Sequence, residues 1–168
     1  RRRRRKKLGA GLRGGGEKLA HTVRATAEAR PTDCWVALDL SNAFGTMLRD
    51  GALEAAAAVV PDCRACLAMF LQRDTRYRFV RSSGEAIWMS AGEGAEQGDV
   101  WGPILYSLAL APCVVALEED LREQLRTAGW EEEAVNEAIG VSAYLDDLVI
   151  RVPPCLAGAV VPAADRAM

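Results

Sequence analysis

Two adjacent carboxylates interrupt an apolar, strand-like stretch, AYLDDLVIR, at residues 143–151. The side chains on both sides of Asp146 and Asp147 are mostly large or β-branched, which is typical of a strand that packs in a core. Burying an unpaired carboxylate costs several kcal/mol or more. The pair therefore either occupies an exposed turn or holds a cation. A tight turn at Leu145–Asp147 would lift the acids out of the strand pairing.

A second expected strand also ends in an acid. The segment CWVALDL, residues 34–40, is mostly apolar and carries Asp39 near its end. If the two strands lie side by side in one sheet, Asp39 and Asp146 converge on one point, and a divalent cation can partner both carboxylates. From these residues alone, an exposed hairpin tip with two acids remains the alternative.

The composition indicates a globular protein. Half of the 168 residues are apolar, which is enough for one domain with a core. No uninterrupted apolar run, Ala55–Pro61 included, is long enough to cross a bilayer, and no apolar signal region follows the basic start. Five scattered cysteines suggest no disulfide framework. We therefore expect an intracellular protein in a reducing compartment, without membrane contact.

Charge is distributed unevenly along the chain. Residues 1–30 contain 11 Lys/Arg and 2 Glu, a net of +9, whereas residues 31–168 contain 10 Lys/Arg and 21 Asp/Glu, a net of −11. The block RRRRRKK is typical of an unfolded tail, so we expect residues 1–12 to form a disordered basic arm. The arm either contacts nucleic-acid phosphates or serves as a localisation tail.

Helices and short strands are expected in mixed order, which predicts an α+β fold. Glycines at 14–16 precede a helix that ends before PTD, and further helices are expected at 53–60, 63–73, 103–125 and 131–139. Segments 75–81 and 86–90 form an expected hairpin. Its arginines either face solvent or touch a phosphate backbone. Trp35, Trp88 and Trp130 are expected at or near the core.

Three segments stand in the order and rough spacing of polymerase motifs A, B and C. They are LDLSNAF at 38–44, EQGDVWGPILYSLAL at 96–110 and AYLDDLVI at 143–150. Together they resemble a reverse transcriptase of the non-LTR retrotransposon type, and RGGGEKLAHTVRA at 13–25 is similar to the stretch before motif A in that family. The resemblance implies that residues 13–168 form a polymerase palm with partial fingers. The implied fold is a small antiparallel sheet flanked by helices, with the thumb absent.

The same resemblance implies a metal site. Asp39 matches the motif A carboxylate, and Asp146 and Asp147 match the motif C pair. These three residues would be catalytic and would bind two Mg²⁺ ions, or Mn²⁺, with the backbone carbonyl of Leu40 as a further ligand. Two such ions clamp the attacking and leaving oxygens of a phosphoryl transfer.

Further residues match positions that contact nucleotide or primer in the family. Phe44 falls at the steric gate, where a ring leaves no room for a 2′-hydroxyl and so favours deoxynucleotides. Gln97 and Gly98 match the motif B pair, in which the glycine lets the backbone approach the new base pair and the glutamine touches nucleotide and template. Tyr144 and Leu145 would lie beneath the primer end.

The implied activity is RNA-directed DNA polymerisation, a nucleotidyltransferase reaction in the nucleus or cytoplasm. Its partners are an RNA template, a DNA primer and deoxynucleoside triphosphates. Val100, Trp101 and Gly45 depart from the family pattern. Three alternatives stay open: a decayed, inactive retroelement fragment, a nucleic-acid-binding module without catalysis, and a group II intron maturase.

Overall fold

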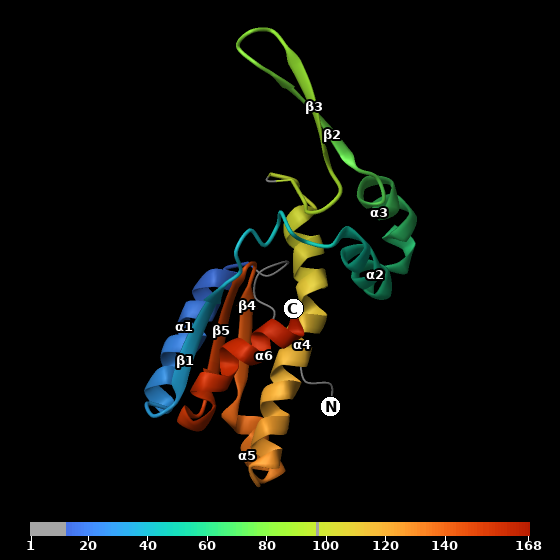
Figure 1. Cartoon of the computed structure of the whole chain (residues 1–168). Coiled ribbons are helices and arrows are strands. Elements are labelled where there is room, and N and C mark those ends of the chain that lie inside the picture. The colour runs from blue at the N-terminus through green and yellow to red at the C-terminus, as the bar shows by residue number, and fades with distance from the viewer. Residues whose placement is uncertain (1–12, 97) are drawn as a thin grey trace. The chain divides into compact units, whose positions relative to one another are not determined.

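Helices alternate with short antiparallel strands along the described chain, residues 13–96 and 98–168 of the computed structural model (Figure 1). The expected α+β class is confirmed. The basic arm expected at 1–12 and Gln97 lie outside the described residues. The chain divides into two compact units: one contains the chain up to Ser41 together with Leu110–Met168, and the other is Asn42–Ala109. Helix α4 (Gly102–Thr127) begins in the second unit and continues into the first.

A three-stranded antiparallel sheet organises the first unit. Its order is β1 (Cys34–Asp39), β5 (Asp147–Val152), β4 (Gly140–Tyr144), so the last strand of the chain lies in the middle. Alternate residues of β1 and β5 share a face, because strand side chains have a period of two. Val36 stands opposite Ile150, and Leu38 stands opposite Leu148.

This apolar face of the sheet packs on helices. Residues of α4, α5 (Glu132–Ala138), η2 (Pro154–Ala159) and α6 (Val160–Ala167) join the sheet residues in one core. Leu117, Leu121, Val135, Ile150 and Val160 are almost completely buried there. Burying each such side chain stabilises the fold by about 1.5–3 kcal/mol, so this core fixes the register of the sheet.

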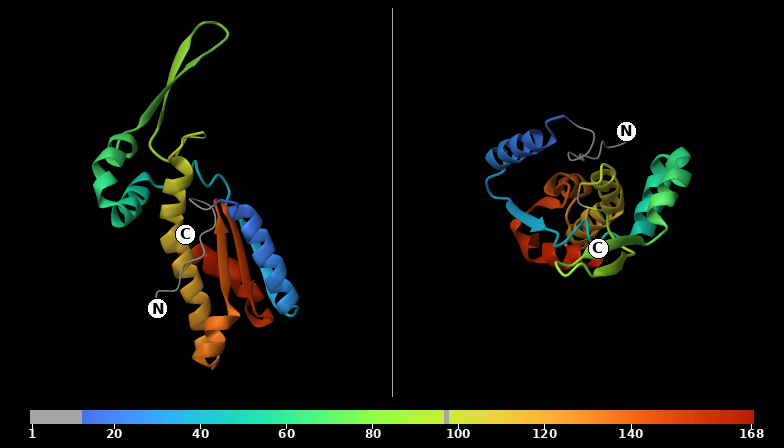
Figure 2. Two further views of the ribbon diagram at one scale, coloured as in Figure 1. Left: turned by 180° about the vertical axis from the view of Figure 1, so that it is seen from behind. Right: turned by 90° about the horizontal axis from the view of Figure 1, so that it is seen from above.

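Helix α1 (Gly15–Ala29) lies against the opposite face of the same sheet (Figure 2). Leu19 and Val23, one turn apart, are half-buried there, as the helical spacing predicts. Gly16 lies close to Tyr144 of β4: a Cβ at Gly16 would stand 3.6 Å from the tyrosine ring. The sheet is therefore covered by helices on both faces.

The second unit contains two short helices and a hairpin. Helix α2 (Arg49–Val59) begins earlier than the expected 53 and ends before Pro61, which opens η1 (Pro61–Cys63) and α3 (Arg64–Leu71). Strands β2 (Thr75–Val80) and β3 (Ala86–Ala91) pair antiparallel, which confirms the expected hairpin. Gly84, with φ 85°, adopts at the hairpin tip the left-handed conformation that suits glycine.

A buried arginine holds the second unit together. Arg49 donates from Nε to the carbonyl of Gly94 at 2.8 Å, from Nη1 to the carbonyl of Arg73 at 3.0 Å and from Nη2 to Thr75 Oγ1 at 3.3 Å. This arginine is 7% exposed. The side chain thus joins α2, the start of β2 and the segment that follows β3. No helix of the described chain is both long enough and apolar enough to cross a membrane.

Candidate metal centre

The strand-like stretch AYLDDLVIR is a hairpin of two strands. Strands β4 and β5 are joined through Leu145 and Asp146, so the expected tight turn is present at the first two of its three positions. Leu145 has φ 56°, a left-handed conformation that costs a non-glycine residue roughly 1–2 kcal/mol. Two-residue hairpin turns usually place glycine, asparagine or aspartate at such a position. Tertiary packing of the hairpin therefore maintains a turn that the local sequence disfavours.

Asp147 is not lifted out of the sheet but opens β5, directly opposite Asp39 of β1. Next along the ladder, the Leu40 N–H donates to the Asp146 carbonyl at 3.4 Å. Hydrogen-bonded and non-hydrogen-bonded pairs alternate, so Asp39 and Asp147 form the closer, non-hydrogen-bonded type, with Cα atoms about 4.5 Å apart. Both carboxylates therefore project from the same face at the same end of the sheet.

Asp146 lies in the turn, as the expected turn implies. It stands opposite Leu40, while its neighbour Asp147 faces Asp39. Asp146 is half-buried, whereas Asp39 and Asp147 are exposed. The carboxylate nearest to Asp39 by strand register is consequently the second of the motif C-like pair.

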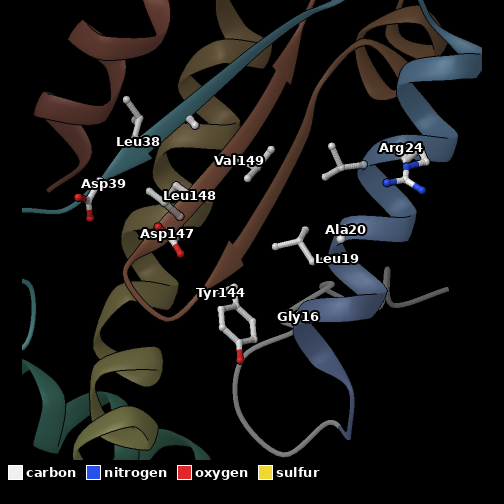
Figure 3. A pocket seen from close by; sticks show the side chains of 12 residues that line it. Gly16, Leu19, Ala20, Arg24, Leu38, Asp39, Tyr144, Asp147, Leu148 and Val149 are labelled. Atoms are coloured by element: carbon white, nitrogen blue, oxygen red, sulfur yellow. The ribbon is translucent and has the colours of Figure 1, made fainter.

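A pocket of about 640 Å³ lies between α1 and the sheet, and the two exposed acids belong to its lining (Figure 3). Tyr144 stands opposite Asp147 in the register, so Asp39, Asp147 and Tyr144 form a row across β1, β5 and β4. The remaining wall is mainly apolar, with Leu19 and Val149 among its residues, and the cationic side chain of Arg24 of α1 also belongs to the lining. The pocket thus has an apolar wall, the two acids and an arginine that forms no ion pair with either acid among the described residues.

Neither of the two facing carboxylates, Asp39 and Asp147, has a cationic partner within ion-pair distance in the part of the chain that the structure describes. Like charges directly opposite each other destabilise a strand pair. Residues 13–96 and 98–168 contain no group of three or more His, Cys, Asp or Glu that is arranged to hold a metal. Two carboxylates fit Mg²⁺ nevertheless, because Mg²⁺ is commonly held by one or two carboxylates together with substrate phosphates.

The motif A- and B-like residues beyond Ser41 belong to the second unit. Phe44 is half-buried, and its ring lies 4.8 Å from that of the buried Tyr106 at an angle of 36°. Gly98 has φ 97°, and no atom lies within 4 Å of the position that a Cβ would take, so backbone conformation rather than packing favours glycine there. Asp99 accepts the N–H of Trp101 at 2.9 Å, just before α4 begins.

Sequence reasoning missed one residue of structural note, Arg49, and assigned another, Trp88, to the wrong environment. Arg49 follows the motif A-like segment, and no periodic pattern distinguishes a buried arginine from a solvated one. Trp88 was expected at or near the core, but it is 66% exposed, so that prediction is wrong. Trp130 is also exposed, at 39%, while Trp35 is half-buried. The alternation of β3 provided the signal for Trp88, because it places the ring on the face of the hairpin that carries the arginines.

Comparison of the chain with models of known protein families gives no match, and comparison with curated proteins gives none either.

Proposed function

We propose that this chain is the palm portion of a reverse transcriptase similar to those of non-LTR retrotransposons. The proposed reaction adds deoxynucleotides to a primer 3′-hydroxyl on an RNA template. One observation carries the proposal: Asp39 and Asp147 face each other on adjacent strands, and neither has a cationic partner among the described residues. Such a pair is unfavourable unless something cationic binds it.

In this proposal the acids at the end of the sheet bind the metals. Asp39 and Asp147 would supply carboxylate oxygens. Asp146 and the backbone carbonyl of Leu40, which the resemblance adds as ligands, lie one position further along the same pair of strand ends. Divalent ions held there would lower the pKa of the primer hydroxyl and neutralise the pyrophosphate leaving group. Tyr144, next to Asp147 in the same row, would support the primer end.

Residues of the second unit carry proposed roles through the resemblance. Phe44, five positions after Asp39, would select against ribonucleotides, while Gln97 and Gly98 would contact the nascent base pair. The Phe44 ring packs on the ring of Tyr106. This contact restricts rotation of the Phe44 side chain, and a ring that excludes a 2′-hydroxyl must keep a fixed position. The alternatives predict different behaviour: an inactive fragment binds metal without turnover, and a simple nucleic-acid-binding module needs no metal. A maturase would share the chemistry, and only its choice of template would differ.

The first test is metal binding, measured by titration of Mn²⁺ with electron paramagnetic resonance detection. We expect the wild-type chain to bind Mn²⁺, and Asp39→Asn or Asp147→Asn to weaken binding by at least the about 10–100-fold that loss of an outer-shell partner costs. Asp165→Asn, which changes an exposed acid of α6, is the matched control and should leave the affinity unchanged. Equal affinity in all four proteins would contradict the metal site.

Primer extension on poly(rA)/oligo(dT) with Mg²⁺ or Mn²⁺ then separates enzyme from inactive fragment. Extension that is lost in Asp147→Asn and kept in Asp165→Asn supports the proposed reaction. Metal binding without extension by the wild-type chain favours the inactive fragment.

A further inference from the structure

One face of the β2–β3 hairpin combines arginines with an exposed tryptophan. Arg76 and Arg78 alternate along β2, and the register places Trp88 directly opposite Arg78 and Ser90 opposite Arg76. Residues opposite each other in an antiparallel pair project to the same side, with Cβ atoms about 4.5–5.5 Å apart. Both arginines are exposed, and Trp88 is 66% exposed. We call Arg76, Arg78 and Trp88 the Arg–Trp face.

The opposite face of the hairpin is held by its own unit. Tyr77 projects there and donates its hydroxyl to Glu96 Oε1 at 2.8 Å, and this hydrogen bond to a carboxylate raises the pKa of Tyr77. Thr75, at the start of the same face, accepts a hydrogen bond from Arg49. The hairpin is therefore anchored by one face, and the Arg–Trp face is left to solvent.

The two arginines of the Arg–Trp face form no ion pair with any of the described residues. At the hairpin tip Arg81 pairs with Glu85 at 2.9 Å, and at its base Asp74 accepts a hydrogen bond from Ser90 at 3.1 Å. Arg76 and Arg78, in contrast, have no ion pair in the described part of the chain. One guanidinium, of Arg78, thus stands opposite an exposed indole, and the other, of Arg76, stands diagonally to it on the same strand as Arg78. Both belong to a segment, residues 31–168, whose net charge is −11.

We propose that the Arg–Trp face binds single-stranded nucleic acid: Arg76 and Arg78 contact phosphates, and a base stacks on Trp88. Positive charge that follows a backbone, combined with aromatic rings that stack on bases, is the arrangement by which proteins hold unpaired strands. The anionic partner is complementary to the two free arginines. The choice of nucleic acid over other polyanions rests on the proposed function, but binding at this face requires neither the acids nor a metal.

A single strand fits this face better than a duplex. The indole can stack only on a base that is not already stacked and paired within a helix, and each base stacked on an aromatic side chain contributes substantially to affinity. A second copy of the chain fits less well, because the arginines of two such faces would repel each other.

The test compares two 12-mers of equal charge, oligo(dT) and an abasic oligonucleotide, both fluorescein-labelled. Fluorescence anisotropy of the full chain is measured in EDTA, so that metal binding at the acids plays no part. We expect the wild-type chain to bind oligo(dT) more tightly than the abasic strand by about fivefold or more, the range of one stacked base. Trp88→Ala should remove this preference, and Trp88→Phe should keep part of it.

Arginine substitutions test the phosphate contacts separately. Arg76→Gln with Arg78→Gln should weaken binding of both strands alike, because phosphates are present in both. Matched controls are Trp130→Ala, at an exposed tryptophan of the other unit, and Arg64→Gln, at an exposed arginine of α3; neither should change either affinity.

Three outcomes would overturn the inference. They are an unchanged preference in Trp88→Ala, an equal loss in Trp130→Ala, and a change of oligomeric state in Trp88→Ala, seen by sedimentation, with binding of both strands intact. The last would identify the face as a self-association surface. Because these measurements contain no metal, failure here leaves the Mn²⁺ titration unaffected, and failure of that titration leaves this result standing.

Discussion

At the scale of single residues, the facing pair Asp39 and Asp147 does not help the sheet to fold, so its presence calls for a reason other than stability. Strand pairs gain stability from complementary side chains, and two carboxylates in the closer type of pair do the reverse. Leu145 adds a second local cost in the neighbouring turn, where its φ is 56°. Two unfavourable choices within three positions are typical of a site shaped for binding rather than for stability.

The repulsion can be measured as stability. In EDTA at low salt, Asp147→Asn should raise the free energy of unfolding by roughly 0.2–1 kcal/mol, because it removes one of two like charges directly opposite each other. Urea denaturation followed by circular dichroism gives the value, and Asp165→Asn is again the control. With Mn²⁺ present, wild type should instead have the higher free energy of unfolding, because the metal stabilises only the protein that binds it. A variant less stable than wild type in EDTA would show that the pair does not repel.

The sequence identified the acids that lie together at the end of the sheet, but it did not predict how they pair across the strands. Asp39 was placed at the end of its strand, and the acids at 146–147 were placed in or near a turn. Asp39 and Asp146 were expected to converge on one metal; the register places Asp147 directly opposite Asp39 and Asp146 one position further on, opposite Leu40. A shift of one residue reverses every side chain of a strand, and the sequence contains no turn signal such as Asn-Gly that would have fixed the register in advance.

At the scale of elements, Arg49 explains why two short helices and an isolated hairpin form one unit. A two-stranded hairpin is marginally stable in water by itself. The guanidinium bonds one acceptor before β2, one within β2 and one after β3, so both ends of the hairpin are tied to α2.

Replacing this arginine should therefore loosen the unit. Arg49→Lys keeps the charge but cannot reach three divergent acceptors, and we expect a loss of about 2–4 kcal/mol in the free energy of unfolding. Arg64→Lys, on the exposed surface of α3, should stay within about 0.5 kcal/mol of wild type. Hydrogen exchange of residues 73–94 adds a local measure: protection there should fall in Arg49→Lys alone. Similar behaviour of the two variants would count against the role of Arg49.

Most elements were visible in the sequence, and the errors have physical causes. Helices α1 to α5, β1 and the β2–β3 hairpin follow periodicity and glycine or proline boundaries, whereas η2 and α6, which follow β5, were not predicted. The β4–β5 hairpin resembles one strand in the sequence because apolar side chains continue on both sides of a turn that lacks glycine. The exposed Trp88 was misplaced because a large aromatic residue usually marks a core.

At the scale of the whole molecule, the chain has a basic part and an acidic part, and a nucleic acid would be attracted by the first and repelled by the second. Residues 1–30 carry a net charge of +9, and residues 31–168 carry −11. Long-range attraction to a polyanion must then come mainly from the first part, while Arg76 and Arg78 act at short range. If the chain binds nucleic acid as proposed, the first part would supply affinity that depends on salt, and the Arg–Trp face would supply recognition of unpaired bases.

Deleting residues 1–7 should separate these contributions. The logarithm of the oligo(dT) affinity falls with the logarithm of the salt concentration, by about 0.7 for each phosphate that the protein neutralises. Removing seven positive charges should therefore make this slope shallower by up to about 5. The preference for oligo(dT) over the abasic strand should remain, because Trp88 is unaffected. Anisotropy titrations at several salt concentrations measure both quantities. An unchanged slope would mean that the basic segment does not neutralise phosphates.

The order of the strands also determines when the sheet can form during translation. Strand β1 pairs only with β5, and 107 residues lie between Asp39 and its partner Asp147. At about 5–20 residues per second, the ribosome needs roughly 5–20 s to deliver that partner. During this interval Asn42–Ala109, a continuous segment, can fold, whereas β1 waits with both edges unpaired. The nascent chain is thus most exposed to aggregation and to chaperones before the strand that carries Asp147 emerges.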